Sequence, residues 1–266
     1  MWSKSADVLF AYREANLLVC KMPQVRTADK WAYKTGSGIT RMAKEGGGGI
    51  VGIPCLILGE SGSGKSSSLR NFEPEEIGIF NVASKPLPFR KQLKKADGAT
   101  YQTIQRVLMQ PELKRYVIDD SQFLLCFELF DRTGETGYTK FTEMAVHFYR
   151  LVKLVIEQTP PDVIVYFLHH TEQTDGRVKA KTIGKMLDEK LTLEGLFSIV
   201  LMAENENGEY SFRVKGNGSD TVKSPPEMFG SDRIDNDLKL VDEKIRDYWG
   251  LTTDNKNNDK ESEEEK

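Results

Sequence analysis

The residues with the clearest chemical potential run from Gly59 to Ser66, in the order Gly-Glu-Ser-Gly-Ser-Gly-Lys-Ser. This order matches G-x-x-x-x-G-K-[ST], the pattern of a loop whose backbone N–H groups surround phosphate groups. The apolar run 53–58 precedes the loop, and residues 66–71 have helix-forming capacity. Because such a loop binds phosphate where it joins a strand to a helix, the sequence predicts a nucleotide-binding site.

Each residue type in this loop has a predicted role. Glycines at positions 59, 62 and 64 permit a positive φ and keep side chains away from the anion. Lys65 can reach the β- and γ-phosphates, and the Ser66 hydroxyl can bind Mg²⁺. We expect the nucleotide to be held by Gly59, Glu60, Ser61, Gly62, Ser63, Gly64, Lys65, Ser66 and Ser67.

Two neighbouring carboxylates, Asp119 and Asp120, directly follow the apolar residues 116–118. At the end of a buried strand in a phosphate-loop ATPase, one such acid holds the Mg²⁺ shell and its neighbour orients or deprotonates the attacking water. We therefore predict that Asp119 binds the metal with Ser66 and that Asp120 is the candidate base. An aspartate pair at a strand end can instead cap a helix, and the sequence leaves this alternative open.

Polar residues also end the apolar run 162–168, where His169, His170 and Thr171 follow in order. A polar side chain at such a strand end can lie beside the γ-phosphate and detect its loss, so we predict this role for His170 or Thr171. His169 is expected to pack or to cap. Two histidines at a surface strand end are the alternative. A zinc site is not predicted, because no third histidine or cysteine is near.

Residues 175–190 are rich in positive charge, which includes Arg177 and Lys179. Lysines here could act on the nucleotide of a neighbouring subunit or contact a nucleic-acid backbone. A solvated loop with neither role is the third possibility. The candidate catalytic residues of the whole chain are then Lys65, Asp120, His170, Lys181 and Lys185.

The hydrophobic pattern predicts an α/β fold in which a mainly parallel sheet is flanked by helices. Strand-like runs occur at residues 53–58, 76–82, 115–118, 162–168 and 196–202, and helical spacing at 3–20, 100–113, 123–130, 141–158 and 236–249. The Asn207-Gly208 pair predicts the turn of an antiparallel hairpin whose second strand is 209–215. We expect a basic, partly flexible extension over 1–49, one phosphate-loop domain over 50–250 and a disordered acidic tail over 251–266.

The overall charge does not point to a nucleic-acid partner. The chain contains 37 Lys and Arg and 40 Asp and Glu, so it has no overall positive charge, and any contact with nucleic acid must come from a local patch. Cys20, Cys55 and Cys126 are isolated, which predicts reduced thiols rather than a disulfide framework. The apolar runs are strand-sized and no signal peptide opens the chain, so we expect a cytoplasmic protein with no membrane partner.

Taken together, the motifs resemble those of the RecA-like P-loop ATPases. The resemblance is closer to a group of bacteriophage AAA-domain ATPases that includes single-strand-annealing recombination ATPases. Beyond the phosphate loop it is carried by residues 80–82, 85–89, 117–120, 169–172, 181–185, 193–197, 217–218 and 223–225. It covers residues 50–248, and residues 1–45 lie outside it.

This resemblance implies a RecA-like fold, ATP binding, Mg²⁺-dependent ATP hydrolysis and assembly into a homo-oligomeric ring or filament. It also implies a role in phage DNA recombination or replication on single-stranded DNA, with a single-strand-binding or other recombination protein as partner, in the cytoplasm of an infected bacterium. Many RecA-like relatives use a glutamate elsewhere in the fold as the catalytic base. Asp120 departs from that arrangement.

Two functions are compatible with these residues. In the first, the chain hydrolyses ATP, and a neighbouring protomer supplies a cation from Lys179, Lys181, Lys185, Arg213 or Lys215. In the second, nucleotide binding controls an assembly and hydrolysis is slow or incidental. A small-molecule kinase is disfavoured because no arginine-rich lid follows the core strands, and a GTPase because no Asn-Lys-x-Asp sequence is present.

Overall fold

Residues 52–251 are the part of the chain that the computed structural model describes. The helix predicted at 3–20, the extension 1–49 and the acidic tail beyond residue 251 lie outside the described residues. Within them, no helix combines the length and the apolar character needed to cross a bilayer.

Nine strands of the described residues form a mixed sheet in the order β3-β2-β4-β5-β1-β7-β8-β9, and β6 pairs with β5. The pairs from β3 to β7 are parallel, whereas β6, β8 and β9 pair antiparallel. The strands are β1 (Ile53–Gly59), β2 (Gly78–Asn81), β3 (Lys95–Asp97), β4 (Arg115–Asp119), β5 (Ile164–Thr174), β6 (Arg177–Ala180), β7 (Ile199–Glu206), β8 (Glu209–Arg213) and β9 (Arg233–Asp235).

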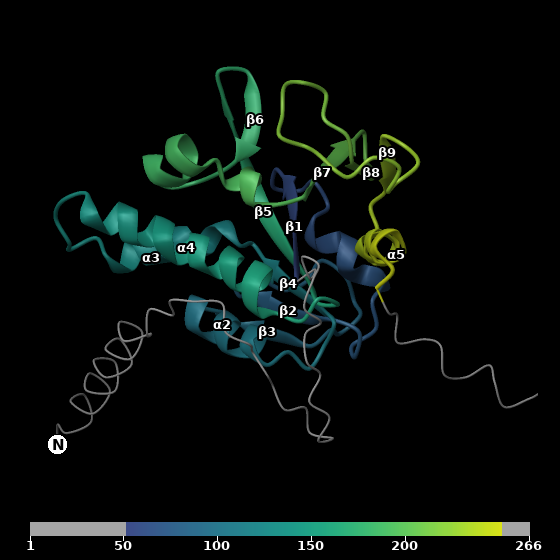
Figure 1. Cartoon of the computed structure of the whole chain (residues 1–266), viewed down its shortest axis with the longest axis horizontal. Coiled ribbons are helices and arrows are strands. Elements are labelled where there is room, and N and C mark those ends of the chain that lie inside the picture. The colour runs from purple at the N-terminus through teal and green to yellow at the C-terminus, as the bar shows by residue number, and fades with distance from the viewer. Residues whose placement is uncertain (1–51, 252–266) are drawn as a thin grey trace, which may run out of the picture. The chain divides into compact units, whose positions relative to one another are not determined.

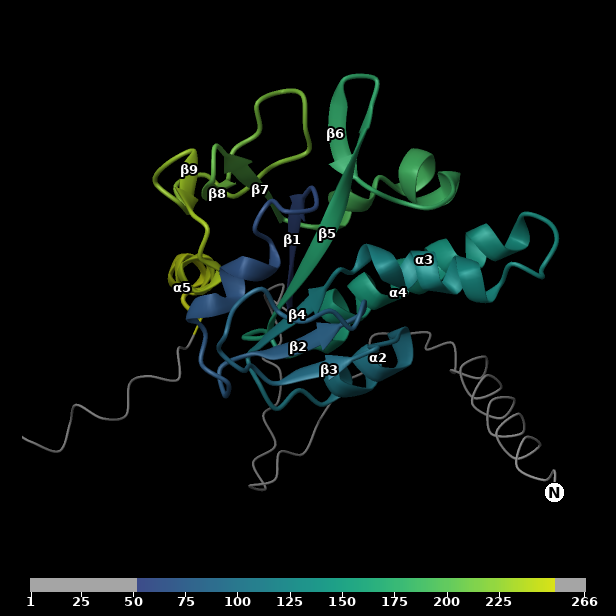
Figure 2. The same ribbon diagram turned by 180° about the vertical axis from the view of Figure 1, so that it is seen from behind.

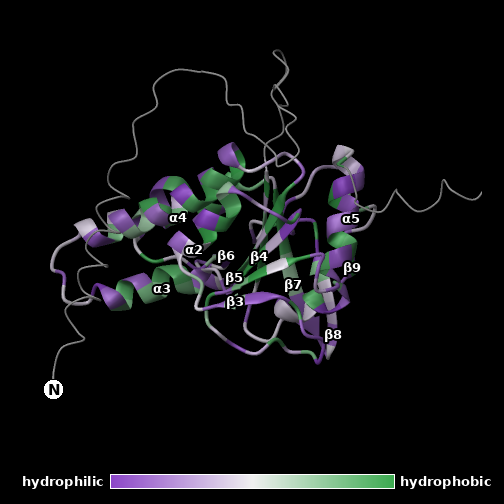
Figure 3. Cartoon of the chain, turned by 90° about the horizontal axis from the view of Figure 1, so that it is seen from below, coloured by the Kyte–Doolittle hydropathy of each residue, from purple (hydrophilic) through white to green (hydrophobic). Residues whose placement is uncertain are grey.

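Helices cover both faces of the sheet (Figure 1). One face packs on α2 (Tyr101–Met109), α3 (Gln122–Asp131) and α4 (Thr139–Gln158), and the other on η1 (Ser66–Asn71) and α5 (Leu238–Trp249). Neighbouring strand residues alternate between these layers: Leu56 faces the first and Ile57 the second. Burial on both faces makes the central strands continuously apolar. Figure 3 shows hydrophobic residues gathered on these strands.

Strand β5 lies between β1 and β4, as Figure 2 shows from behind. In the parallel register, Gly59 of β1 is opposite His170, and Ile118 of β4 is opposite Phe167. The carboxyl ends of parallel strands meet at one edge of a sheet. The phosphate loop, the two histidines and the two aspartates are therefore brought to the same edge.

The strands and helices predicted within residues 52–251 are confirmed in type but differ in extent. The prediction that β5 ends at Leu168 is wrong, because the strand continues to Thr174 and turns back as β6. The expectation of a basic loop over 175–190 is therefore also wrong, since β6 is followed by a π-helical turn, η2 (Met186–Leu191), and a 3-10 turn, η3 (Leu193–Leu196). The short strands β3 and β9 were not predicted, because three residues carry too little periodicity. The β7–β8 hairpin turns at Asn207-Gly208 as predicted.

A buried charge network ties α5 to the amino end of the sheet. Asp242 accepts hydrogen bonds from Tyr166 Oη at 2.8 Å, Arg115 Nε at 2.5 Å and Arg246 Nε at 2.7 Å. The side chains of Asp242 and Arg246 are each 1% exposed. Arg246 also donates to the carbonyl oxygens of Asp162 and Lys114, which precede β5 and β4. Because these groups are shielded from water, each buried charge is stabilised by the other groups of the network.

We expect Asp242→Asn to lower the free energy of unfolding by about 3–5 kcal/mol, because it leaves two arginines without their carboxylate. Urea unfolding followed by circular dichroism measures this change. Lys153→Met is the control: it breaks an ion pair with Glu157 on the surface of α4, and should cost less than about 1 kcal/mol. Equal losses in the two variants would contradict the importance of the buried network.

Candidate functional site

The phosphate loop between β1 and η1 has a backbone shape that requires glycine. Gly62 and Gly64 have φ values of 82° and 91°, which residues with a Cβ atom rarely adopt. A Cβ atom at position 64 would also lie 2.6 Å from Tyr210 Cδ1. The N–H groups of residues 62 and 64–66 make no hydrogen bond to another residue of the described chain. The loop therefore presents unpaired donors, which suit an anion.

The helix after the loop is short. η1 has six residues of 3-10 type, so the N–H groups of the loop, rather than the dipole of a long helix, would hold a phosphate. Ser63 adds a hydroxyl to this set, because its Oγ is buried and has no hydrogen-bond partner within residues 52–251. A phosphate oxygen would satisfy that donor.

Lys65 is buried at the end of the loop, and its ammonium group points back onto the loop. Nζ donates to the carbonyl oxygens of Gly59 at 2.7 Å and Glu60 at 2.8 Å. Burial lowers the pKa of Lys65 to about 8, although the charges of Asp120 and Asp119 oppose the shift. The group is thus mainly protonated at neutral pH, as binding of a polyphosphate requires.

Ser66 and Asp119 meet although they belong to different motifs. Ser66 Oγ donates to Asp119 Oδ1 at 2.8 Å. Burial raises the pKa of Asp119 to about 6, and the hydrogen bond from Ser66 opposes that shift. One hydroxyl and one carboxylate oxygen fit Mg²⁺, which takes few protein ligands and completes its shell with water and phosphate. Across the described residues, no three His, Cys, Asp or Glu side chains are grouped so that they could hold a metal.

Asp120 has a left-handed backbone conformation, with φ of 60°, and its carboxylate has other partners than that of Asp119. Its Oδ1 lies 3.1 Å from His170 Nε2, and its Oδ2 accepts from Lys85 Nζ at 2.7 Å. Burial opposes ionisation, but the hydrogen bonds from His170 and Lys85 outweigh it and lower the pKa of Asp120 to about 2. Such a weakly basic carboxylate is better suited to orienting a water molecule than to removing its proton.

The two histidines of β5 differ in their surroundings. His170 contacts Asp120, whereas His169 is fully buried. Because a carbonyl can only accept, His169 Nε2–H donates to the Lys181 carbonyl at 2.9 Å, and Nδ1 lies 2.9 Å from Ser121 Oγ. Burial lowers the pKa of His169 to about 4, so the ring is neutral at pH 7. His169 therefore packs, as predicted, and His170 is the histidine beside the acid pair.

The predicted basic residues make no contact with the acid pair. The side chains of Lys181 and Lys185 are exposed; Lys181 is linked to the site only through its backbone N–H, which donates to the His170 carbonyl at 2.9 Å. Lys185 also pairs with a carboxylate of the same chain, Glu189, at 3.3 Å, although its side chain is 84% exposed. The remaining cations are paired as well: Lys179 with Glu172 and Asp188, Arg213 with Glu204 and Asp220, and Lys215 with Asp232. Lys179 and Arg213 are thus poor candidates for a cation that reaches another subunit.

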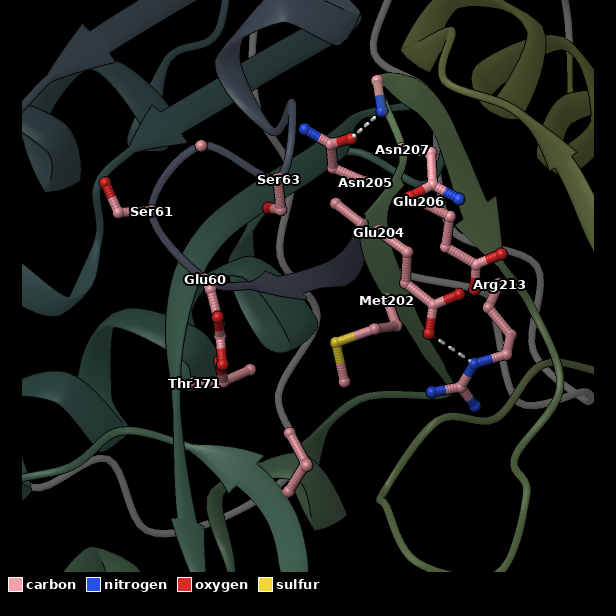
Figure 4. Close-up of a pocket in the computed structure, with 14 residues that line it drawn as sticks. Glu60, Ser61, Ser63, Thr171, Met202, Glu204, Asn205, Glu206, Asn207 and Arg213 are labelled. Atoms are coloured by element: carbon pink, nitrogen blue, oxygen red, sulfur yellow. Dashed lines mark hydrogen bonds and ion pairs between the residues drawn. The ribbon is translucent and has the colours of Figure 1, made fainter.

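A cavity of about 640 Å³ lies between the loop residues 60–63 and the β7–β8 hairpin (Figure 4). Carboxylates of Glu60, Glu204 and Glu206 line it, and Glu204 accepts from Arg213 Nε at 2.8 Å. Thr171 is also in its wall, so of the two predicted sensor residues only His170 contacts the acid pair. Lys65, Ser66 and the two aspartates do not line this cavity, so it is adjacent to the proposed phosphate and metal site and does not include it.

Two residues, one ending β2 and one following it, belong to the site but were given no site role from the sequence, although both lie in the stretches 80–82 and 85–89 that carry the resemblance. Lys85 pairs with Asp120, and Asn81 is buried beneath it. A signal was present, since polar residues follow a predicted parallel strand, where ligand contacts are common. The sequence did not reveal that β2 is the neighbour of β4, so it gave no reason to join Lys85 to the aspartates.

The described chain is thus an α/β protein with a mostly parallel sheet, compatible with a P-loop-like fold. A scan against models of known protein families and a search of curated proteins both return no match.

The buried His169 should make stability depend on pH. Its pKa is lowered on folding, so the unfolded chain binds the additional proton and stability falls as pH drops below the unfolded value of about 6.5. Between pH 7 and pH 5 this residue should cost the folded state about 2 kcal/mol. Urea unfolding of the wild type and His169→Gln at the two pH values measures the difference in slope. A slope in His169→Gln equal to that of the wild type would contradict the assignment.

Proposed function

We propose that this protein binds ATP with Mg²⁺ and hydrolyses it. The observation that carries the proposal is the hydrogen bond from Ser66 to Asp119, 2.8 Å long, which joins two motifs 53 residues apart. Taken singly, the first motif could be a glycine-rich turn and the second a helix cap, with no ligand at either. Their meeting beside unpaired loop donors and the Lys65 ammonium is the arrangement that phosphoryl transfer from a nucleoside triphosphate needs.

In the proposed reaction, the oxygen of a water molecule forms a bond to the γ-phosphorus while the bond from that phosphorus to the β–γ bridging oxygen breaks. The products are ADP and inorganic phosphate, and the water proton passes to the phosphate or to solvent. Bound Mg²⁺ would neutralise charge on the β- and γ-oxygens. The loop N–H groups and Lys65 hold the phosphates, and Asp120 with His170 orients the water.

We also propose that the fold is RecA-like. The mostly parallel sheet supports this, as does the antiparallel β7–β8 hairpin on the far side of β1 from β4. The position of β5 is a further support, because it puts the residues of its carboxyl end, including His170, between the phosphate loop and the acid pair.

Lys65→Ala should lower kcat for ATP hydrolysis at least about 100-fold, because it removes the buried ammonium that balances phosphoryl charge. Release of inorganic phosphate with and without Mg²⁺ measures this. Lys94→Ala, an exposed lysine that pairs with Glu75, should keep wild-type turnover. Hydrolysis that survives in Lys65→Ala, or a wild type that turns over no ATP, would disprove the assignment.

The role in phage DNA recombination, the homo-oligomer and the single-stranded DNA partner are proposals that rest on the resemblance. The exposed side chains of Lys181 and Lys185 support a DNA contact near β6 and η2.

The competing function is an assembly that nucleotide binding controls, with little hydrolysis. It is distinguished from the ATPase by measuring turnover as protein concentration and single-stranded DNA are increased. A strong rise in turnover supports the ATPase, and a flat response with ATP-dependent assembly supports the alternative.

For DNA binding we expect a steep fall of affinity with salt, since lysine–phosphate contacts release counterions. In the double variant Lys181→Ala/Lys185→Ala, the slope of log K against log salt should be shallower by about 1.4, or about 0.7 for each lost contact with a single strand. Fluorescence anisotropy of a labelled oligonucleotide measures it. Lys179→Ala, whose ammonium is held by Asp188, is the matched control; a slope unchanged in the double variant would exclude these lysines from the DNA contact.

A further inference from the structure

Lys85 stands at the acid pair although it belongs neither to the phosphate loop nor to the strand that ends in the two aspartates. We propose that Lys85 is a second phosphate-binding cation of the site, which contacts the γ-phosphate of ATP and is supplied by the same chain that binds the nucleotide. This inference rests on the proposed ATPase function. It names the group that compensates charge at the γ-phosphate and removes the need for a cation from a neighbouring subunit.

The first support is the position of the ammonium. Nζ lies 2.7 Å from Asp120 Oδ2 and 4.9 Å from the centre of the Phe123 ring. The same ring meets His170 edge-on, with centroids 5.9 Å apart. Lys85 therefore shares two partners with His170, the residue that stands beside the acid pair.

The backbone of Lys85 is fixed by a buried side chain. Asn81 is 1% exposed; its Nδ2 donates to the Lys85 carbonyl at 2.7 Å, and its Oδ1 accepts from the Lys85 N–H at 3.3 Å. Asn81 Nδ2 also donates to Asp97 Oδ1, which anchors the amide on β3. A lysine on a free surface loop has no such support. The turn after β2 is thus built to present this one side chain to the end of β4.

The ammonium also retains capacity for a ligand. Its only hydrogen-bond acceptor among residues 52–251 is Asp120, although an ammonium has three donors. The Lys85 side chain is 58% exposed, so its outer side is open to an incoming anion.

Charge requirements explain why a second cation is useful here. In phosphoryl transfer, negative charge is spread over the equatorial oxygens of the γ-phosphate. Lys65 is engaged with the loop carbonyls of Gly59 and Glu60. Lys85 is held at Asp120 instead, so it would add a second positive charge from a different element of the fold.

The test is the comparison of ATP and ADP binding in Lys85→Met, with Mg²⁺ and fluorescent analogues of both nucleotides. We expect ADP affinity within twofold of wild type, ATP affinity lowered about tenfold, and kcat lowered about 100-fold. Lys85→Arg should recover part of the loss, because it keeps the charge. Lys94→Met, a comparably exposed lysine, should behave as wild type. An unchanged ratio of ATP to ADP affinity in Lys85→Met would overturn the proposal.

A purely structural role through Asp120 is tested in the Asp120→Asn background. There, Lys85→Met should still lower ATP affinity relative to ADP, since the contact is to phosphate; no further loss would mean that Lys85 acts only through Asp120 and would overturn the inference.

Mixing Lys65→Ala with Lys85→Met decides which subunit Lys85 serves. A same-chain cation gives no activity beyond the sum of the two variants, because neither chain has a complete site. Activity restored towards wild type would show action on a neighbour and overturn the same-chain assignment. If the wild type neither binds nor hydrolyses ATP, the proposed function fails with this inference. If the wild type is active and Lys65→Ala is not, an unaltered Lys85→Met refutes this inference alone.

Discussion

The parallel pairing of β5 on both β1 and β4 is the constraint on which the site depends. Strand β5 lies between β1, which leads into the phosphate loop, and β4, which leads into the aspartate pair, and it contributes His170 between them. Backbone hydrogen bonds fix this register along seven consecutive positions of β1, from Ile53 opposite Ile164 to Gly59 opposite His170. A one-residue slip would exchange the faces of His169 and His170, burying the wrong imidazole.

The two aspartates show how neighbours in sequence acquire different chemistry. Asp119 is buried against a neutral hydroxyl, and its pKa rises to about 6. For Asp120, burial also opposes ionisation, but a lysine and a histidine bind the carboxylate and its pKa falls to about 2. The difference comes from their partners, because Asp119 accepts from Ser66 after β1, whereas Asp120 contacts Lys85 after β2 and His170 of β5. One acid is thus suited to a metal, and the other to holding cations or water.

The two ends of the sheet differ in role: one stabilises the fold, and the other carries the candidate functional groups. At the amino end, Asp242 and Arg246 are buried among fully partnered donors and acceptors that tie α5 to β4 and β5. At the carboxyl end, loop N–H groups, the Ser63 hydroxyl and the Lys85 ammonium keep unused hydrogen-bonding capacity. Unused donors cost stability, so those at the phosphate-loop edge are consistent with a ligand that completes them.

By itself, the sequence determined the phosphate loop, the acid pair, the types of the longer elements and the β7–β8 turn. These depend on local spacing: glycines where φ must be positive, apolar periods along one strand or helix, and an Asn-Gly turn. Only the tertiary structure decided the strand order, the extension of β5 into a hairpin and the contact of Lys85 with Asp120. The physical reason is that strand neighbours are chosen by long-range hydrogen bonding and shared burial, to which residues 35 positions apart contribute without any local pattern.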